Sequence, residues 1–359
     1  MKLQPNILDG PSLEFIRNFA YPLGVSDIRK LTSAVKASVE LEFEAHDPII
    51  DGIQKIGPSR ISLTINFKEN TKIFGLVSGG WLPLPFVTPQ QFLIDRNVVI
   101  ALQKIRSGKT FLDIASFQWW TKFFDDGSAT FNPLPYAFES GFRKTPTIAE
   151  FRASFEEGVS ELSAAFPKCK IVSYDDRIFN TVYSQLRAFD TRNSKEFEFL
   201  LATCPIIAER KTGKDEAAAL EAILAAAKKA GVEQGSFALP AVLSCLYELK
   251  NGFPVSIGRQ LLKPAHVYTD SAAYNAISDL RHIELAAAGH GCFKGREFAL
   301  CTQDKGLALF WSALSIQAEV NSQNKITFNF DLPPVLFERL TSDKIQLLLK
   351  ELKELKEQA

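Results

Sequence analysis

FALCTQDKGLALFW, residues 298–311, is the stretch that decides the fold. Phe298 to Thr302 form an uncharged run of strand length, and an apolar helical pattern begins at Leu307. Between them, Thr-Gln-Asp-Lys-Gly breaks the apolar run. An uncharged strand of this kind is typical of the middle of a parallel sheet, where the carboxyl ends of strands build sites. The stretch therefore predicts that Asp304 is presented at the end of a central strand.

A second segment, QFLIDRNVVIALQKI at residues 91–105, has the same design, because Asp95 follows an apolar run at the expected strand-to-helix turn. Burying an ionised Asp in such a run is costly unless the carboxylate is paired or metal-bound. Asp95 and Asp304 therefore indicate a shared cation. Each acid taken alone also fits a helix N-cap, so the functional interpretation depends on several acids occurring together.

A third acid, Asp279, lies within a predicted helix upstream of that strand. Apolar and small residues follow helical spacing over residues 271–288, and Gly289 is the expected residue after the helix. Carboxylates that cluster without His or Cys favour hard divalent ions, so we expect Mg²⁺ or Mn²⁺ rather than zinc. No H-E-x-x-H, G-x-S-x-G, Walker or G-x-G-x-x-G motif occurs, which disfavours zinc hydrolases, hydrolase elbows, NTPases and dinucleotide-binding folds.

Taken in order, LIDRNVV, AISDLRHIELAAAG and LCTQDKG resemble the motifs of the PIN-domain nucleases. That family carries an Asp after an N-terminal strand, a Glu on a following helix, an Asp on a helix and a Thr-x-Asp strand end. The resemblance implies a PIN-like three-layer α/β domain with a central parallel sheet. It also implies a divalent-metal-dependent ribonuclease of the toxin-like or defence type, with Asp95, Asp279 and Asp304 as catalytic metal ligands. RNA is the expected substrate, DNA remains open, and a non-cleaving nucleic-acid-binding or protein-scaffolding module is the competing class.

The second acid of that pattern has several candidates. Glu139, in FNPLPYAFESG, is the first choice because it ends an apolar helical segment. Glu150 fits a capping box with Thr147, which gives it a structural explanation. Glu248 follows an apolar stretch that predicts a short strand and then a helix. The choice among Glu139, Glu150 and Glu248 stays open at this point, with Glu248 as the main rival of Glu139.

The charge balance limits how a nucleic acid could be bound. Lys and Arg number 41, as do Asp and Glu, so the chain has no net charge. A nucleic acid would have to meet a local basic surface. Basic residues near the acids are suited to phosphate contacts, and solvated surface charge explains them equally well. These residues are Arg96, Arg143, Lys144, Arg281 and Lys305.

The chain divides into regions of different pattern. Residues 1–88 contain alternating apolar and polar runs typical of half-buried strands, so they predict a separate N-terminal β-containing domain with a sheet of its own. A Pro-rich stretch then leads into a PIN-like domain at residues 89–320, with a helical insertion at about 178–230. Residues 321–359 predict a strand and a charged helix. We expect a homo-oligomer or a protein partner to use the N-terminal domain or this helix.

From residue 90 onward, short apolar runs alternate with helical patterns, as in a parallel α/β sheet. The predicted strands are 91–95, 169–174, 236–239 and 298–302. The predicted helices are 97–106, 113–124, 147–165, 178–188, 215–230, 240–250, 271–288 and 304–315. Asp175 and Asp176, which precede one helix, are interpreted as N-cap residues.

The expected compartment is the cytoplasm. The sequence shows no signal-peptide pattern at its start and no run of about 18 apolar residues, so neither secretion nor membrane insertion is indicated. The 5 cysteines are odd in number and lack a C-x-x-C pair, which is typical of reduced, buried thiols. They are Cys169, Cys204, Cys245, Cys292 and Cys301.

Overall fold

The chain forms two compact units in the computed structural model. The first unit comprises residues 1–134, 156–172 and 293–304, and the second comprises residues 135–155, 173–292 and 305–359. The structure describes residues 20–33, 37–46, 49–50, 53–54, 57–67, 73–84, 87, 91–109, 117, 121, 124, 127–139, 145–187, 189–232, 235–249, 255–292, 298–320 and 326–348.

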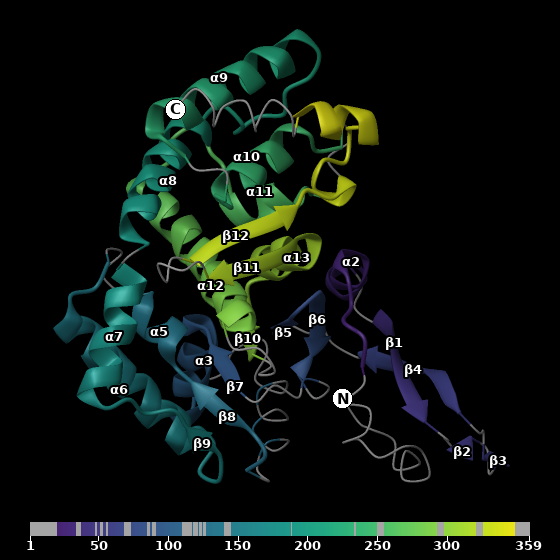
Figure 1. Ribbon diagram of the computed structural model, residues 1–359, viewed down its shortest axis with the longest axis vertical. Helices are drawn as coiled ribbons and strands as arrows, with labels where there is room; N and C mark the ends of the chain where they lie inside the picture. The colour runs from purple at the N-terminus through teal and green to yellow at the C-terminus, as the bar shows by residue number, and fades with distance from the viewer. Residues whose placement is uncertain are drawn as a thin grey trace. The chain divides into compact units, whose positions relative to one another are not determined.

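A six-stranded sheet forms the centre of the first unit, with the strand order β6-β5-β10-β7-β8-β9 (Figure 1). Strands β10, β7, β8 and β9 run parallel to one another, and β5 and β6 add an antiparallel hairpin at one edge, with β5 antiparallel to β10. The chain is thus an α/β protein with a mostly parallel central sheet. The strand bounds are β5 (Phe74–Val77), β6 (Gly80–Pro83), β7 (Gln91–Ile94), β8 (Thr130–Asn132), β9 (Lys170–Ile171) and β10 (Phe298–Thr302).

The expectation that residues 1–88 form a sheet of their own is wrong for residues 74–83. Strand β5 pairs with β10, with Leu76 opposite Leu300, so the central sheet continues across the predicted boundary. Both strands of the hairpin are covered on both faces, and the ring of Trp81 packs edge-on against Phe74 at 5.4 Å. A hairpin this apolar is stable only if both of its faces are covered. A separate N-terminal sheet with one face in solvent would leave one of them exposed.

A second hairpin, β1 (Ala37–His46) paired with β4 (Pro58–Phe67), does show the predicted alternation. Val39, Leu41 and Phe43 are buried, whereas Glu40 and Glu44 are exposed. Helix α2 (Val25–Ser33) contacts β1, and the short strands β2 (Ile49–Ile50) and β3 (Ile53–Gln54) pair with each other. The apolar and polar residues of β1 thus lie on opposite sides of the strand, as the alternating sequence pattern predicts.

Phenylalanine rings fill the core beside the parallel strands of the first unit. Phe92 and Phe131, on adjacent strands, lie 5.5 Å apart, and Phe131 lies 4.4 Å from Phe166. The ring centroids of Phe124 and Phe131 are 5.8 Å apart. The distances given for the other two pairs are also between ring centroids. Helix α3 (Arg96–Arg106) contacts β10. The predicted helix at 113–124 lies mostly outside the described residues.

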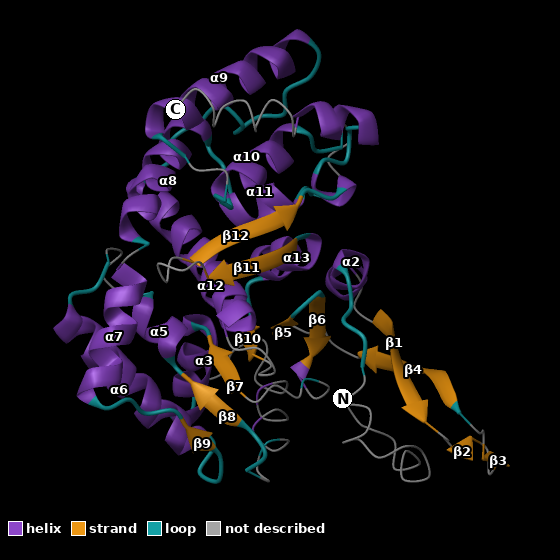
Figure 2. Ribbon diagram, viewed as in Figure 1, coloured by secondary structure: helices purple, strands orange, loops and turns teal. Residues whose placement is uncertain are grey.

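The second unit is mainly helical (Figure 2). The sequence division between the units falls within helix α6. The observed elements are α5 (Leu134–Phe138), α6 (Ile148–Ala165), α7 (Asp176–Arg187), α8 (Asp190–Thr203), α9 (Lys214–Ala230), α10 (Ala238–Leu246), α11 (Ile257–Leu262), α12 (Asp270–Cys292), α13 (Lys305–Ala313), β11 (Ser315–Val320), β12 (Ile326–Asp331) and the 3₁₀ turn η3 (Pro334–Leu336).

Local signals placed several of these helices correctly. The carboxylate of Glu150 accepts the Thr147 N–H at 2.7 Å, and the Thr147 hydroxyl accepts the Glu150 N–H at 3.3 Å, which confirms the capping box. Asp175 accepts the Ile178 N–H at 2.8 Å and so caps α7, as predicted.

Two element predictions in this unit are wrong. Residues 236–239 were expected as a strand, but residues 238 and 239 begin α10, which is buried on all sides. A fully buried helix has no polar face, so its apolar run resembles a buried strand. The helix expected at 304–315 ends at Ala313, and the unpredicted strand β11 pairs with β12. The second unit also extends well beyond the helical insertion expected at 178–230.

Candidate metal centre at the ends of β7 and β10

Asp95 lies at the carboxyl end of β7 and begins α3. The peptide of Asp95 continues the sheet, because its N–H donates to the Cys301 carbonyl of β10 at 3.0 Å. Its side-chain Oδ1 accepts the N–H of Arg96 at 2.6 Å, and the residue is only 2% exposed. The apolar run of β7 thus delivers a carboxylate to the sheet edge, as the sequence predicts.

Thr302 and Asn97 join Asp95 to the end of β10. The Thr302 hydroxyl donates to Asp95 Oδ2 and accepts the N–H of Asp304 at 3.0 Å. The Asn97 amide donates to the same Asp95 Oδ2 at 2.7 Å, and its oxygen accepts the Gln303 N–H at 3.1 Å. These contacts fix Asp95 and the Thr-x-Asp turn of Asp304 as one polar cluster.

The cluster lies where the strand order of the sheet reverses. Along the chain β7 comes first, β8 and β9 follow on one side of it, and β10 is added on the other side. In open parallel sheets, ligands bind outside the carboxyl ends of strands at such a switch point. The half-buried Asp304 and the buried Asp95 therefore occupy the edge where a binding site is expected.

The donor atoms of this cluster are oxygens. Burial raises the pKa of the adjacent Cys301 thiol well above its usual range, and the charge of Asp95 acts in the same direction. A thiol held in its protonated form is a poor metal ligand and a poor nucleophile. Two carboxylates, a hydroxyl and an amide oxygen are a donor set that suits Mg²⁺ or Mn²⁺.

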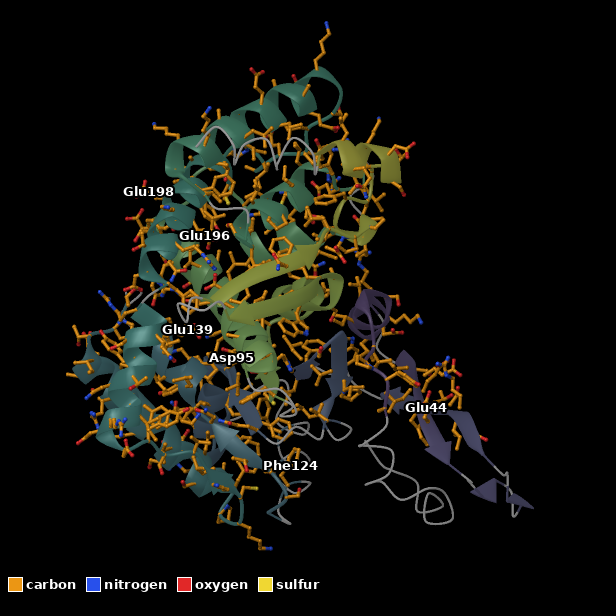
Figure 3. The ribbon with its side chains drawn as sticks, in the orientation of Figure 1. Glu44, Asp95, Phe124, Glu139, Glu196 and Glu198 are labelled. Atoms are coloured by element: carbon orange, nitrogen blue, oxygen red, sulfur yellow. The ribbon has the colours of Figure 1, made fainter. Side chains whose placement is uncertain are left out.

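The other two predicted acids belong to the second unit. Asp279 lies on α12, as predicted, and Glu139 directly follows α5 (Figure 3); both are half-buried. Ligand atoms of Glu139 and the buried His282 lie within 4.8 Å of each other. Sequence reasoning missed His282, although it follows Asp279 by one helical turn on a mostly apolar helix. That Glu139 and Asp279 complete a site with Asp95 and Asp304 stays a prediction.

The two alternatives to Glu139 have structural partners. Glu150 forms the capping box with Thr147. Glu248 is 1% exposed, and its carboxylate accepts from Arg259 Nη2 at 2.7 Å and from Arg210 Nε at 3.1 Å. Arg259 also donates to two backbone carbonyls beyond α8. Glu248 thus belongs to a buried ion-pair network, which favours Glu139 as the second acid.

The predicted phosphate contacts differ in exposure. Arg281 is 8% exposed, and its guanidinium lies over the Phe138 ring at 5.2 Å and donates to the Thr145 hydroxyl at 3.3 Å. Burial lowers the pKa of Arg281. A phosphate could reach it only if these contacts opened, so Arg281 is better explained as a structural residue. Arg96 and Lys305 are half-buried, and Arg143 and Lys144 lie outside the described residues.

No family model, curated protein or solved structure matches this chain. None of the helices in the described part of the chain is long and apolar enough to cross a lipid bilayer. The fold and the site alone therefore define the class: an α/β protein with carboxylates at the carboxyl ends of two adjacent parallel strands.

Proposed function

We propose that this chain is a divalent-metal-dependent ribonuclease of PIN-like architecture that hydrolyses phosphodiester bonds. The observation that carries the proposal is the hydrogen-bonded junction of Asp95 with the Thr302-Gln303-Asp304 turn at the switch point of the sheet. Structural N-caps alone do not require Asp95 to be joined to the turn of a second acid across neighbouring strands. A shared cation does.

The residues of the junction have distinct roles in this proposal. A bound Mg²⁺ or Mn²⁺ would supply a more acidic water and positive charge opposite the phosphodiester. Asp95 and Asp304 would hold the ion through carboxylate oxygens. Thr302 and Asn97 fix the orientation of the Asp95 carboxylate by donating to Oδ2, as outer hydrogen-bond partners do at metal sites. Asp279 is predicted to be the third metal ligand and, with Glu139, to hold the waters of the ion.

RNA is the proposed substrate, and a DNA substrate is the alternative to be tested beside it. Because the chain has no net charge, binding would depend on a local basic surface that includes Arg96 and Lys305. A toxin-like or defence role and a cytoplasmic location rest on the sequence resemblance and the cysteine pattern.

A non-cleaving nucleic-acid-binding or scaffolding module is the second candidate. The observation that favours it is the set of hydrogen bonds at Asp95, which accepts from Arg96 N, Asn97 and Thr302 and caps α3. These bonds give Asp95 a structural purpose that requires no ion. Metal-dependent cleavage is what separates the two functions.

The test is RNA cleavage by the full chain. Wild type, Asp95→Asn and Asp304→Asn are incubated with single-stranded and structured RNA, and with DNA, in Mn²⁺, in Mg²⁺ and with a chelator. We expect the wild type to cut RNA only with metal, and both Asn variants to lose activity by at least about a hundredfold. Glu44→Gln, which alters an exposed acid of the same unit (Figure 3), should cut normally.

Two results would decide against the nuclease. Cleavage that survives both Asn substitutions would place the chemistry elsewhere. RNA binding by the wild type without metal-dependent cutting would support the binding module. Circular dichroism and thermal unfolding of each variant establish that a loss of activity is not a loss of fold.

A further inference from the structure

The second unit buries a cluster of charged and polar side chains between helices α8 and α12, which contact each other. Its two deepest acids are Glu196 of α8, 1% exposed, and Glu284 of α12, 3% exposed. Arg192 and Asn193 accompany Glu196 on α8, and Ser278, Arg281 and His282 accompany Glu284 on α12; all are buried. Charged residues in an interior are costly unless they are paired, so their pairing decides their charge states.

The two buried guanidinium groups of the cluster already have carboxylate partners. Arg192 Nη1 donates to Glu284 Oε1 at 3.0 Å. Arg281 Nη2 lies 3.7 Å from Asp190 Oδ1, and Asp190 is also paired with Arg187 at 2.8 Å. Glu196 is therefore a third carboxylate beside two buried cations.

The groups that the structure describes around Glu196 do not supply a third cation for its carboxylate. The Ser236 hydroxyl is hydrogen-bonded to its carboxyl group, and Ser236 Oγ itself accepts the Ala238 N–H at 3.1 Å. Within the part of the chain that the structure describes, Glu196 Oε1 and both side-chain polar atoms of Asn193 have no hydrogen-bond partner. Burial first, and then the charge of Glu284, raise the pKa of Glu196 to about 8.

We propose that Glu196 is a proton-binding site of the α8–α12 pair: it holds a proton at neutral pH, and its ionisation in alkaline solution loosens α8 from α12. The charged groups that act on it are Arg192 on α8, and Arg281 and Glu284 on α12. Asp190, which pairs with Arg281, and the buried His282 are the other titratable groups of the cluster. This inference goes beyond the proposed nuclease, because none of the residues that hold the metal takes part. Since α12 also carries Asp279, the loosening would extend to the helix of a predicted site residue.

The direction of the pH dependence follows from the pKa shift. The ordinary pKa is 4.5 and the folded value is about 8, so the folded protein binds this proton more tightly than the unfolded chain. The contribution of this proton to the free energy of unfolding is fully present below the ordinary pKa. It declines as the pH rises and is lost once the pH passes the folded pKa.

The test uses the full chain with glutamate labelled by ¹³C at the side-chain carboxyl carbon, followed by NMR from about pH 4 to about pH 10. Wild type is compared with Glu196→Gln, with Glu284→Gln and with the control Glu198→Gln, which alters an exposed acid two residues along the same helix (Figure 3). The melting temperature of each protein is measured over the same pH range.

We expect one carboxyl resonance to titrate with a midpoint above neutrality, to vanish in Glu196→Gln and to persist in Glu198→Gln. In Glu284→Gln its midpoint should fall, because Arg192 is released to pair with Glu196. The melting temperature of Glu196→Gln should rise relative to wild type as the pH increases toward the folded pKa. Carboxyl resonances that all titrate below about pH 6, or a high-pH resonance that survives Glu196→Gln, would overturn the proposal.

Discussion

Thr302 is the residue that joins Asp95 to the turn of Asp304. A hydroxyl can donate one hydrogen bond and accept another, and Thr302 does both: it donates to Asp95 and accepts from the Asp304 N–H. The Thr-x-Asp pattern therefore has a physical reason. Its first residue orients the acid of the neighbouring strand, and the same hydroxyl accepts the backbone N–H of its third residue.

Replacing Thr302 by Val should expose this dual role. Val has nearly the same shape but leaves the buried Asp95 Oδ2 and the Asp304 N–H each without one partner. We expect the free energy of unfolding to fall by about 1–3 kcal/mol, measured by urea denaturation. If the proposed site is active, metal-dependent cleavage should fall on the order of tenfold. Thr302→Ser keeps the hydroxyl and should recover most of both; a Val variant equal to wild type would refute the role.

The sequence predicted the two acids of the first unit, Asp95 and Asp304, but not the residues that form hydrogen bonds with them. Asp95 and Asp304 stand out because each follows an uncharged run. The contacts of Thr302 and Asn97 depend on the register between β7 and β10, which no single segment contains. His282 belongs to no H-E-x-x-H motif and was not singled out, yet a ligand atom of it lies within 4.8 Å of one of Glu139.

Among the elements, those with local end signals were predicted well. The helix expected at 215–230 is observed as Lys214–Ala230, with acidic residues in its first turn, basic residues in its last, and Gly231 in the left-handed conformation at φ 68°. The β5–β6 hairpin was assigned to the wrong sheet, and the start of α10 was expected as a strand, because runs buried on all sides carry no periodicity. Their environment, rather than their own sequence, selects the structure.

Two close helix contacts of the second unit depend on glycine. Helix α11 contacts α10 and α13. A Cβ placed on Gly258 of α11 would lie 2.0 Å from the Ala241 carbonyl oxygen of α10, and one on Gly306 of α13 would lie 2.6 Å from the Gln260 carbonyl oxygen. Backbone cannot yield as a side chain can, so these glycines set how closely the helices approach.

Gly258→Ala should accordingly force α10 and α11 apart. We expect a loss of stability of at least about 1–3 kcal/mol, as for overpacked cores, measured as the shift in the urea midpoint. Gly24→Ala is the matched control, because a Cβ there meets nothing within 4 Å. Equal stability of the two variants would show that the helices can separate without cost.

For the whole molecule, the order of the chain explains why the hairpin at residues 74–83 joins the central sheet and not a separate N-terminal sheet. The first unit is assembled from residues 1–134, 156–172 and 293–304, so its sheet is completed only when β10 inserts between β5 and β7. Sequence patterns mark boundaries between consecutive segments, such as the Pro-rich stretch before residue 89. They do not reveal that a strand near residue 300 joins a hairpin near residue 80.

This topology predicts how truncated chains behave. A fragment of residues 89–359 lacks β5 and β6 and exposes the edge of β10, where Leu300 is otherwise buried. We expect it to aggregate or to lack a cooperative thermal transition, whereas residues 20–359 should unfold cooperatively. Calorimetry of both fragments checks this; a cooperative 89–359 fragment would restore the separate N-terminal domain.

Calorimetric titration of Mn²⁺ into the full chain tests the central claim most directly, because it reports on the ion whether or not the right RNA has been found. We predict saturable binding to the wild type and to Glu44→Gln, and its loss in both Asp95→Asn and Asp304→Asn while all four proteins remain folded. Absence of saturable binding to the wild type, or binding unchanged in the two Asn variants, would contradict a metal site at the ends of β7 and β10.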